Sequence, residues 1–361
     1  MTRLRFFGVN SNTGIGIHCQ NVMHAIQALQ IKGLEVEFYS YENIKDIEAS
    51  IESSKDEDVN VFFQPINFLI RLKGLKLFWC VFESSRPPES ILAFDKHVEY
   101  FISPSAWGRS CLINYGIKSD KVFVIPEGVD PTIYHPYNRV RKTNNVKKIL
   151  MLGKYESRKG YAEALEAFAI AYDKRKDIEL WVKPDWIVGG SSQIPNEFIN
   201  LCQKYAHLPI VVVKGNLGIT EIKNLYNEAD IFLFPSKCEG WGLPLIEALA
   251  SGVPTICCDY GGQEEYLMGI DEYIHKIPFK LNRIDCDIYK RHYPSEDNDF
   301  GTWASFESND ISKLIFRVLD TSDQQLKSNA EIASKLIRDN YNWRIAGEGL
   351  YKLAIKDKFK Y

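Results

Sequence analysis

Residues 232–259 constrain the fold of this chain more than any other part of the sequence. The apolar run at 231–234 is typical of a strand covered on both faces, and Pro235 ends it. Pro244 suits the first turn of a helix, because that position needs no backbone N–H. Gly252 ends the helix, and a second apolar run follows. The stretch therefore predicts a strand, a loop, a helix and a strand, the repeating pattern of a doubly wound α/β fold.

Two carboxylates frame the predicted turn between strand and helix. Glu239 lies in the loop, and Glu247 lies about one turn inside the helix. Backbone N–H groups at a helix N-terminus bind anions, and glycines allow close approach. Carboxylates accept hydrogen bonds strongly from hydroxyls, so the pattern indicates a phosphorylated, hydroxyl-rich ligand. The alternative is an ordinary turn whose first-turn Glu complements the helix dipole. The predicted anion site comprises Gly240, Trp241, Gly242 and Leu243.

The sequence from Glu239 to Glu247, EGWGLPLIE, resembles the E-x7-E motif of retaining glycosyltransferases with the GT-B fold, the family-four group. The resemblance implies that Glu239 holds the hydroxyls of the transferred sugar and that Glu247 holds the nucleotide ribose. It also implies that the glycine-rich amides bind the diphosphate. The expected fold class is α/β, with two doubly wound Rossmann-like domains facing a cleft.

Three cations follow a second predicted strand at 149–152: Lys154, Arg158 and Lys159. The related family has a G-R…K-G turn here, whose cations hold the donor diphosphate. Lys159 matches the family's Lys and joins Glu239 as a candidate catalytic residue. Lys154 stands where the family has Arg, which keeps the charge but loses bidentate geometry, and Arg158 offers a guanidinium nearby. Solvated surface cations are the alternative interpretation.

Three more residues are candidates for substrate binding. Lys214 and Asn216 lie in the region that the family places against the nucleotide base. Gly16 belongs to a glycine loop in an opening βαβ pattern, which in the family lies near the acceptor or the donor phosphate. A nicotinamide enzyme is a weaker option, because Cys19 occupies the third-glycine position of G-x-G-x-x-G.

A length of 361 residues suggests two domains. We expect an acceptor-side domain at 1–142, to which a C-terminal helix at 343–361 crosses back, and a donor-binding domain at 143–340. Residues 126–136 resemble the family's P-x-G-V-D…F-x-P element, and the basic stretch 139–148 is interpreted as an exposed linker.

Composition bounds the partners and the compartment. A net charge of -3 argues against nucleic acid as a principal partner. The eight cysteines show no C-x-x-C pair, no signal peptide precedes the first strand, and no apolar run is long enough to span a bilayer. We expect a cytoplasmic protein. Residues 68–77 mix cations with leucines, so peripheral membrane contact and an ordinary solvated face are both open.

No metal or other cofactor is expected. Asp285 and Asp287 formally make a D-x-D motif, but no apolar strand precedes them, and the segment 273–306 departs from the family pattern. Many relatives carry a His-acidic pair where this chain has Phe82-Glu83, so the role of Glu83 stays open.

The sequence thus predicts a retaining, metal-independent hexosyltransferase. The donor would be a nucleotide diphosphate sugar, with UDP or GDP as the carrier. The acceptor would be a hydroxyl of a glycan, a lipid or a protein. Two alternatives remain open: another sugar-nucleotide enzyme of this fold, such as an epimerase or a phosphorylase, and a non-catalytic sugar-binding derivative.

Overall fold

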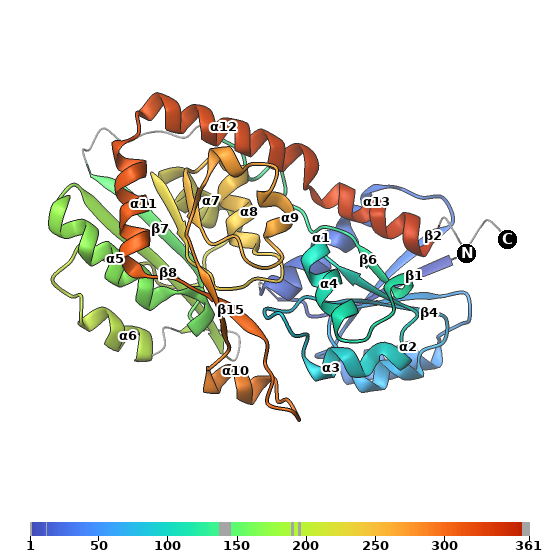
Figure 1. Ribbon diagram of the computed structural model, residues 1–361. Coiled ribbons are helices and arrows are strands. Elements are labelled where there is room, and N and C mark those ends of the chain that lie inside the picture. The colour runs from blue at the N-terminus through green and yellow to red at the C-terminus, as the bar shows by residue number, and fades with distance from the viewer. Residues whose placement is uncertain (1, 12, 137–145, 189–190, 194–195, 356–361) are drawn as a thin grey trace. The chain divides into compact units, whose positions relative to one another are not determined.

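The computed structural model describes residues 2–11, 13–136, 146–188, 191–193 and 196–355 (Figure 1). The chain forms two compact units. Unit 1 comprises Met1–Gly128, Ile284–Thr302 and Tyr341–Tyr361, and unit 2 comprises Val129–Arg283 and Trp303–Asn340.

This division differs from the predicted boundary at 142/143, which lies outside the described residues, as does most of the predicted linker. Residues 284–302 join unit 1 because they bond to the loop that follows strand β4. The Thr302 N–H donates to Ser85 Oγ at 2.8 Å, and Arg86 pairs with Asp297.

Unit 1 is built on a parallel six-stranded sheet in the order β2-β1-β3-β4-β5-β6. Its strands are β1 (Thr2–Gly8), β2 (Leu34–Ser40), β3 (Val59–Phe62), β4 (Leu75–Trp79), β5 (Tyr100–Ser103) and β6 (Val122–Val124). Its helices are α1 (Gly14–Ala28), α2 (Ile44–Glu52), α3 (Glu89–Leu92), α4 (Ala106–Asn114), α10 (Asp287–His292) and α13 (Trp343–Ala354). Short 3-10 helices occupy Asn67–Arg71, Ala93–Lys96 and Ser119–Lys121.

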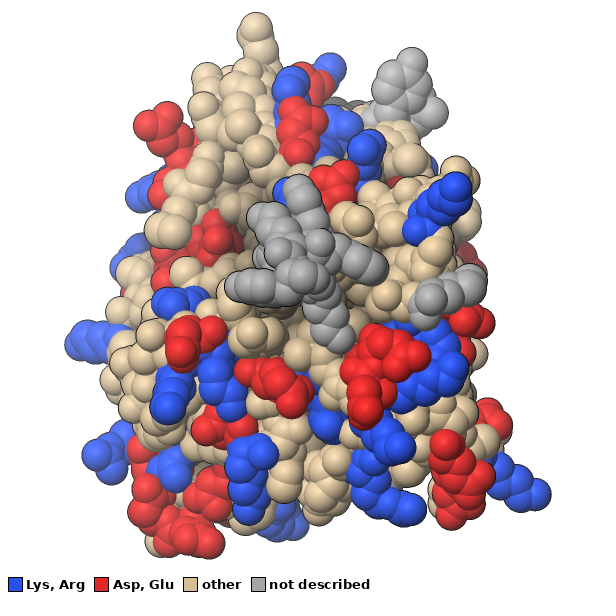
Figure 2. Space-filling model, turned by 90° about the vertical axis from the view of Figure 1, so that its right-hand side faces the viewer, with Lys and Arg blue, Asp and Glu red and all other residues tan. Residues whose placement is uncertain are grey.

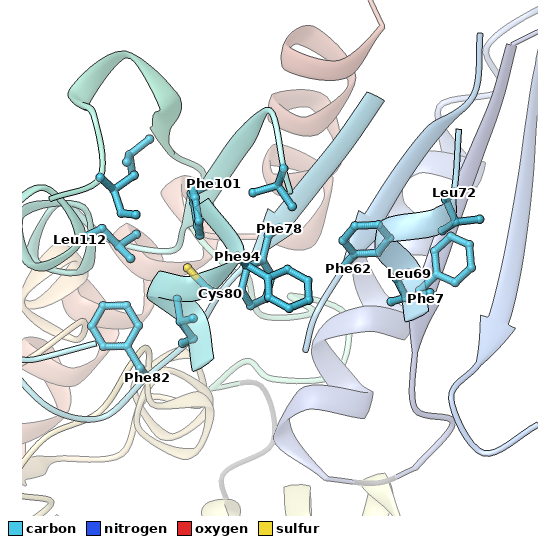
Figure 3. Close-up of a cluster of buried hydrophobic side chains, with 14 of the residues drawn as sticks. Phe7, Phe62, Leu69, Leu72, Phe78, Cys80, Phe82, Phe94, Phe101 and Leu112 are labelled. Carbon is cyan, nitrogen blue, oxygen red and sulfur yellow. The ribbon is translucent and has the colours of Figure 1, made fainter. Parts of the chain in front are cut away.

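A row of aromatic side chains crosses this sheet and forms much of its core. Phe7 is in register with Phe62, Phe62 with Phe78, and Phe78 with Phe101, so the four share one face. All are buried, and Figure 3 shows Phe101 near Leu112 of α4 and Phe78 beside Phe94. Strands covered on both faces are expected to carry such near-continuous apolar runs.

Unit 2 contains a parallel sheet in the order β10-β8-β7-β11-β12-β13, with β9 antiparallel to β8. These strands are β7 (Lys147–Lys154), β8 (Ile178–Val188), β9 (Ser191–Gln193), β10 (Ile210–Val212), β11 (Ile231–Phe234), β12 (Thr255–Cys257) and β13 (His275–Lys276). A separate ribbon pairs β14 (Lys280–Arg283) with β15 (Thr302–Ser305). The helices are α5 (Tyr161–Lys174), α6 (Asn196–Gln203), α7 (Ile219–Glu228), α8 (Leu243–Ala250), α9 (Glu264–Leu267), α11 (Ser308–Asp320) and α12 (Asp323–Asn340).

The strand order of unit 2 reverses between β7 and β11. From β7 the chain passes through α5 to β8, and from β11 it passes through α8 to β12 on the other side (Figure 1). Right-handed crossovers in opposite directions place α5 and α8 on opposite faces of the sheet. Loops that leave the carboxyl ends of two such strands diverge and open a crevice, the usual ligand position in open α/β sheets.

Local hydrogen bonds fix the starts of two helices. Helix α1 begins at Gly14, and the Thr13 side chain caps it by accepting from the Gly16 N–H. Gly218 is the N-cap of α7, and its N–H donates to the Glu221 carboxylate at 2.6 Å.

The distribution of surface charge and the state of the cysteines are consistent with the small net charge and the cysteine spacing of the sequence. Cationic and anionic side chains are interspersed on the face drawn in Figure 2, without a large area of one sign. All eight cysteines are thiols rather than halves of disulfides, and six of them are buried. Among the described residues, no helix has the length and apolar character needed to cross a membrane.

A buried ionic network ties the first strands of unit 1 together. The Arg5 side chain, on β1, is fully buried and donates to the Ser50 carbonyl at 2.7 Å. Asp58 is also fully buried; it accepts from Arg3 Nε at 2.9 Å and lies 3.4 Å from Arg5 Nη1. Buried charges persist only when paired, so Asp58 compensates two guanidinium groups at once.

Replacing Asp58 with Ala should therefore lower the free energy of unfolding by about 1.5–3 kcal/mol, because Arg3 and Arg5 lose a charged hydrogen-bond partner, while Glu37 stays 3.1 Å from Arg5 Nε. Chemical denaturation followed by circular dichroism measures the change. Asp56→Ala, two residues away on an exposed side chain, is the matched control and should stay within about 0.5 kcal/mol of wild type. A loss below about 1 kcal/mol for Asp58→Ala would contradict the network's role.

Candidate functional site

Two loops meet at the strand-order reversal of unit 2. One follows β7 and contains the 3-10 helix Ser157–Lys159, and the other follows β11. Their backbones touch: the Lys237 N–H donates to the Arg158 carbonyl at 2.6 Å. Gly160 has φ +68°, and a Cβ there would lie 2.2 Å from the Pro235 carbonyl oxygen. Only glycine fits this approach, which sets the spacing between the side chains of the two loops.

The Glu239 carboxylate lies between two cations of the neighbouring loop. Its Oε1 accepts from Lys159 Nζ and, at 2.5 Å, from Ser236 Oγ. Its Oε2 lies 2.9 Å from Arg158 Nη1, and Arg158 Nη2 lies 2.9 Å from Glu156 Oε2. Arg158, Lys159 and Glu239 are all at least nine-tenths buried. The structure therefore brings both predicted catalytic residues, Glu239 and Lys159, into direct contact.

Electrostatics keep Glu239 ionised. Burial acts to raise its pKa, but the charges of Arg158 and Lys159, with hydrogen bonds from Lys159 and Ser236, outweigh burial and hold the pKa at about 2. The carboxylate is thus an acceptor at all physiological pH values, and it partly neutralises the two cations.

Two glycines of the following turn fix the backbone of Glu239. The Gly262 N–H donates to the Glu239 carbonyl at 2.7 Å. A Cβ at Gly261 would lie 2.6 Å from the Glu239 carbonyl oxygen, and one at Gly262 would lie 1.8 Å from the Gly240 carbonyl oxygen. The turn at Gly261 and Gly262 therefore supports the loop that carries Glu239 through direct backbone contact.

Helix α8 begins immediately after this loop. Gly242 is its N-cap with φ +92°, and no side chain caps the helix. The Trp241 side chain is 1% exposed and packs edge-on against Tyr266, whose hydroxyl donates to the Trp241 carbonyl at 3.0 Å. Trp241 was predicted to bind substrate. Its burial restricts such binding to its backbone, in line with the predicted amide site at 240–243.

The second carboxylate, Glu247, occupies a different environment. It is half-buried on α8 and accepts a hydrogen bond at 3.0 Å from the Tyr226 hydroxyl of α7. Tyr134, in the segment before β7, also hydrogen-bonds to it. Burial raises the pKa of Glu247 to about 7, although both tyrosine hydrogen bonds act in the opposite direction.

The other residues that were predicted to bind substrate do not belong to the contacts around Glu239 and Glu247. Lys154 is exposed at the end of β7, and Lys214 and Asn216 are exposed just after β10. All three follow carboxyl ends of parallel strands, so they share one sheet edge with Glu239. Gly16 belongs to unit 1, where a Cβ would lie 2.1 Å from the Ser11 carbonyl oxygen. Close packing alone accounts for that glycine.

Three site residues were not singled out from the sequence: Ser236, Tyr226 and Tyr134. Ser236 lies three residues before Glu239, within reach of its side chain in a tight loop. Their contact could therefore have been predicted from the sequence. Tyr134 stands where the family element at 126–136 has Phe, so the sequence already showed an additional hydroxyl group at this position. Nothing local to Tyr226 indicated its contact with Glu247.

The D-x-D string is a surface feature in this structure. Asp285 is exposed and pairs with Lys290 at 2.7 Å, and the preceding strand, β14, is exposed along its length. Within the described part of the chain, no group of three or more His, Cys, Asp or Glu side chains is arranged to hold a metal ion.

Residues 138–269 match a family model described as "Glycosyl transferases group 1". Among curated proteins, mannosylfructose-phosphate synthase of Agrobacterium fabrum is 27% identical over 162 residues, which are 41% of this chain and 35% of that protein. The chain thus spans about a third of that relative's length.

Solved structures resemble nearly the whole chain. Sucrose-phosphate synthase from Thermosynechococcus elongatus gives a TM-score of 0.75 at 14% identity, covering 99% of each chain. Anabaena Alr3699/HepE, in complex with UDP and glucose, gives 0.69 at 12% identity, covering 98% of this chain and 99% of that one. At these identities the similarity shows the fold, which is GT-B. The predicted resemblance to GT-B glycosyltransferases is confirmed, and assignment to the E-x7-E group stays a prediction.

Replacing Gly262 with Ala should displace the loop that carries Glu239. The added methyl group collides with the Gly240 carbonyl, so we expect the unfolding temperature to fall by about 2–10 °C, as for other overpacked sites. Differential scanning calorimetry measures this change. Gly269→Ala is the control, because a Cβ there meets no atom within 4 Å. Equal unfolding temperatures for the two variants would contradict the packing argument.

Proposed function

We propose that this protein is a retaining glycosyltransferase that moves a sugar from a nucleotide diphosphate sugar to an acceptor hydroxyl. The observation that carries the proposal is the buried cluster of Arg158, Lys159 and Glu239 beside the uncapped N-terminus of α8. The group 1 match, which falls on this part of the chain, supports glycosyl transfer as the reaction.

The cluster suits the chemistry of a departing diphosphate. Negative charge grows on the leaving phosphate as the glycosidic bond breaks, and preorganised cations and amides stabilise such charge strongly in a buried site. Lys159, Arg158 and the first N–H groups of α8 would supply this stabilisation. Since Glu239 already binds both cations, the donor would share them with its carboxylate, whose remaining lone pair would accept from a sugar hydroxyl.

In a front-face mechanism, the acceptor hydroxyl attacks from the side that the diphosphate leaves, and the leaving phosphate takes the acceptor's proton. The new glycosidic bond then keeps the donor's anomeric configuration. We assign no protein general base to this step, and Glu239 acts by positioning the sugar.

A panel of nucleotide sugars tests the proposal. UDP-, GDP- and ADP-linked hexoses are screened by thermal shift, and mass spectrometry then follows donor consumption with and without acceptor sugars. NMR of the product reports the anomeric configuration, and an inverted product would overturn the retaining assignment. An epimerised donor, or a requirement for orthophosphate, would indicate an epimerase or a phosphorylase. Binding without turnover would indicate a sugar-binding protein.

We propose that transfer needs no metal ion, because buried cations are available for the charge that a metal would otherwise neutralise. Activity with the donor found in the panel should persist in excess EDTA. Loss of activity on chelation, with recovery on adding manganese or magnesium, would refute this and return attention to Asp285 and Asp287.

Substitutions of the two carboxylates should have different effects on nucleotide binding. Glu247→Gln should weaken binding of the free nucleoside diphosphate by about 1–3 kcal/mol, the cost of a lost charged hydrogen bond. Glu239→Gln should not weaken that binding, because its sugar partner is absent and Arg158 and Lys159 lose a competing anion, yet sugar transfer should fall strongly. Isothermal titration calorimetry measures both affinities. Comparable weakening in the two variants would contradict the assignment of ribose and sugar.

A further inference from the structure

Glu247 is held from two sides by tyrosine hydroxyls. Tyr226, on α7, is fully buried, with its hydroxyl 3.0 Å from Glu247 Oε2 and 3.1 Å from the Pro244 carbonyl oxygen. Tyr134 hydrogen-bonds to Glu247 from the segment that precedes β7. The two aromatic rings pack edge-on, with centroids 6.0 Å apart, and Tyr226 packs in the same way on Phe232. The hydroxyls are thus fixed by ring packing as well as by hydrogen bonding.

A tight turn orients Tyr134. The Asp130 carboxylate accepts from the Thr132 N–H at 2.8 Å, and the Asp130 carbonyl accepts from the Tyr134 N–H at 2.9 Å. Further along, Pro136 packs against Gly252, where a Cβ would lie 2.9 Å from the Pro136 Cβ. Residues 130–136 therefore run beside α8 from Glu247 to its C-terminal end, anchored at both ends.

The number of unused acceptor positions on the Glu247 carboxylate indicates which groups it can still bind. An ionised carboxylate offers about four lone-pair positions, and the two tyrosines occupy two of them. Two positions remain on a side chain that its surroundings bury only in part. A nucleoside ribose presents two hydroxyl donors on adjacent carbons, which matches this remainder.

We propose that Tyr134 and Tyr226 are positioning residues that orient the Glu247 carboxylate so that its two free acceptor positions face the 2′- and 3′-hydroxyls of the donor ribose. The inference rests on the proposed function and adds a source of selectivity for ribonucleotides. A carboxylate that is already fixed in this orientation loses less conformational freedom on binding both hydroxyls than one that rotates freely. The phenols would thus act through Glu247 without touching the ligand.

Calorimetry with UDP and GDP, each compared with its 2′-deoxy and 3′-deoxy form, tests the proposal. Wild type should bind a ribonucleotide at least about tenfold more tightly than either deoxy form, as for a lost hydrogen bond to a charged group. Tyr134→Phe and Tyr226→Phe keep the rings and remove the hydroxyls. Each should reduce that preference by about two- to tenfold and leave affinity for the deoxy forms nearly unchanged.

Two controls separate positioning from general damage. Tyr172→Phe removes a tyrosine hydroxyl from α5 and should leave the preference at the wild-type value. In a Glu247→Gln background, the Tyr134 and Tyr226 changes should have little further effect, because residues that act through one group are not additive. If Tyr226→Phe fails to fold, Tyr134→Phe, which restores the side chain of the related family, carries the test alone.

The outcomes are distinguishable. Wild type that binds none of these diphosphates overturns the proposed function and this inference with it. Wild type that binds and prefers ribonucleotides, with variants that keep this preference, overturns the inference alone. Equal weakening of ribonucleotide and deoxynucleotide binding also overturns it, because that result indicates a purely structural role for the tyrosines.

Discussion

The ion pairs of Glu239 with Lys159 and Arg158 are the interaction on which the candidate site depends. Desolvation makes each of these buried charges costly alone, and together they compensate one another. The backbone geometry around them follows from this requirement. Glycine at 160 allows the two loops to touch, and glycine at 262 allows the next turn to support Glu239. Placing three ionic groups within hydrogen-bonding distance leaves no room for a Cβ at either position.

The topology of unit 2 explains why these residues, far apart in sequence, come together. Strand order reverses between β7 and β11, so the two loops leave the carboxyl ends of neighbouring strands and meet at the same edge of the sheet. One loop brings Lys159 and the other brings Glu239. Unit 1 also reverses its strand order, between β1 and β3, and Gly16 lies in the helix that follows β1. There, tight packing against Ser11 accounts for the glycine without a ligand.

Local pattern predicted the elements between residues 231 and 252 well, because strand, turn and helix signals act over short distances there. It also singled out Glu239 and Lys159, which the structure brings into contact. Local pattern did not predict the features that depend on packing between residues far apart in the sequence. Ile284–Thr302 joins unit 1 through Arg86 and Ser85, contacts that no local pattern encodes. The contact of Tyr226 with Glu247 depends on how α7 packs beside α8, which the periodicity of either helix leaves undetermined.

The two glutamates of the motif show how one short segment supplies two different carboxylates. Two adjacent cations hold the pKa of Glu239 at about 2, whereas burial without a cationic partner raises the pKa of Glu247 to about 7. A pair of acids with such divergent environments is suited to divergent tasks. Glu239 remains charged and is coupled to the cations that would meet a diphosphate. Within the described part of the chain, the side chains that hydrogen-bond to Glu247 are the neutral hydroxyls of Tyr226 and Tyr134, and bringing further hydroxyl donors to it favours its ionised form. Ligand hydroxyls would then complete an environment that the tyrosines only partly provide.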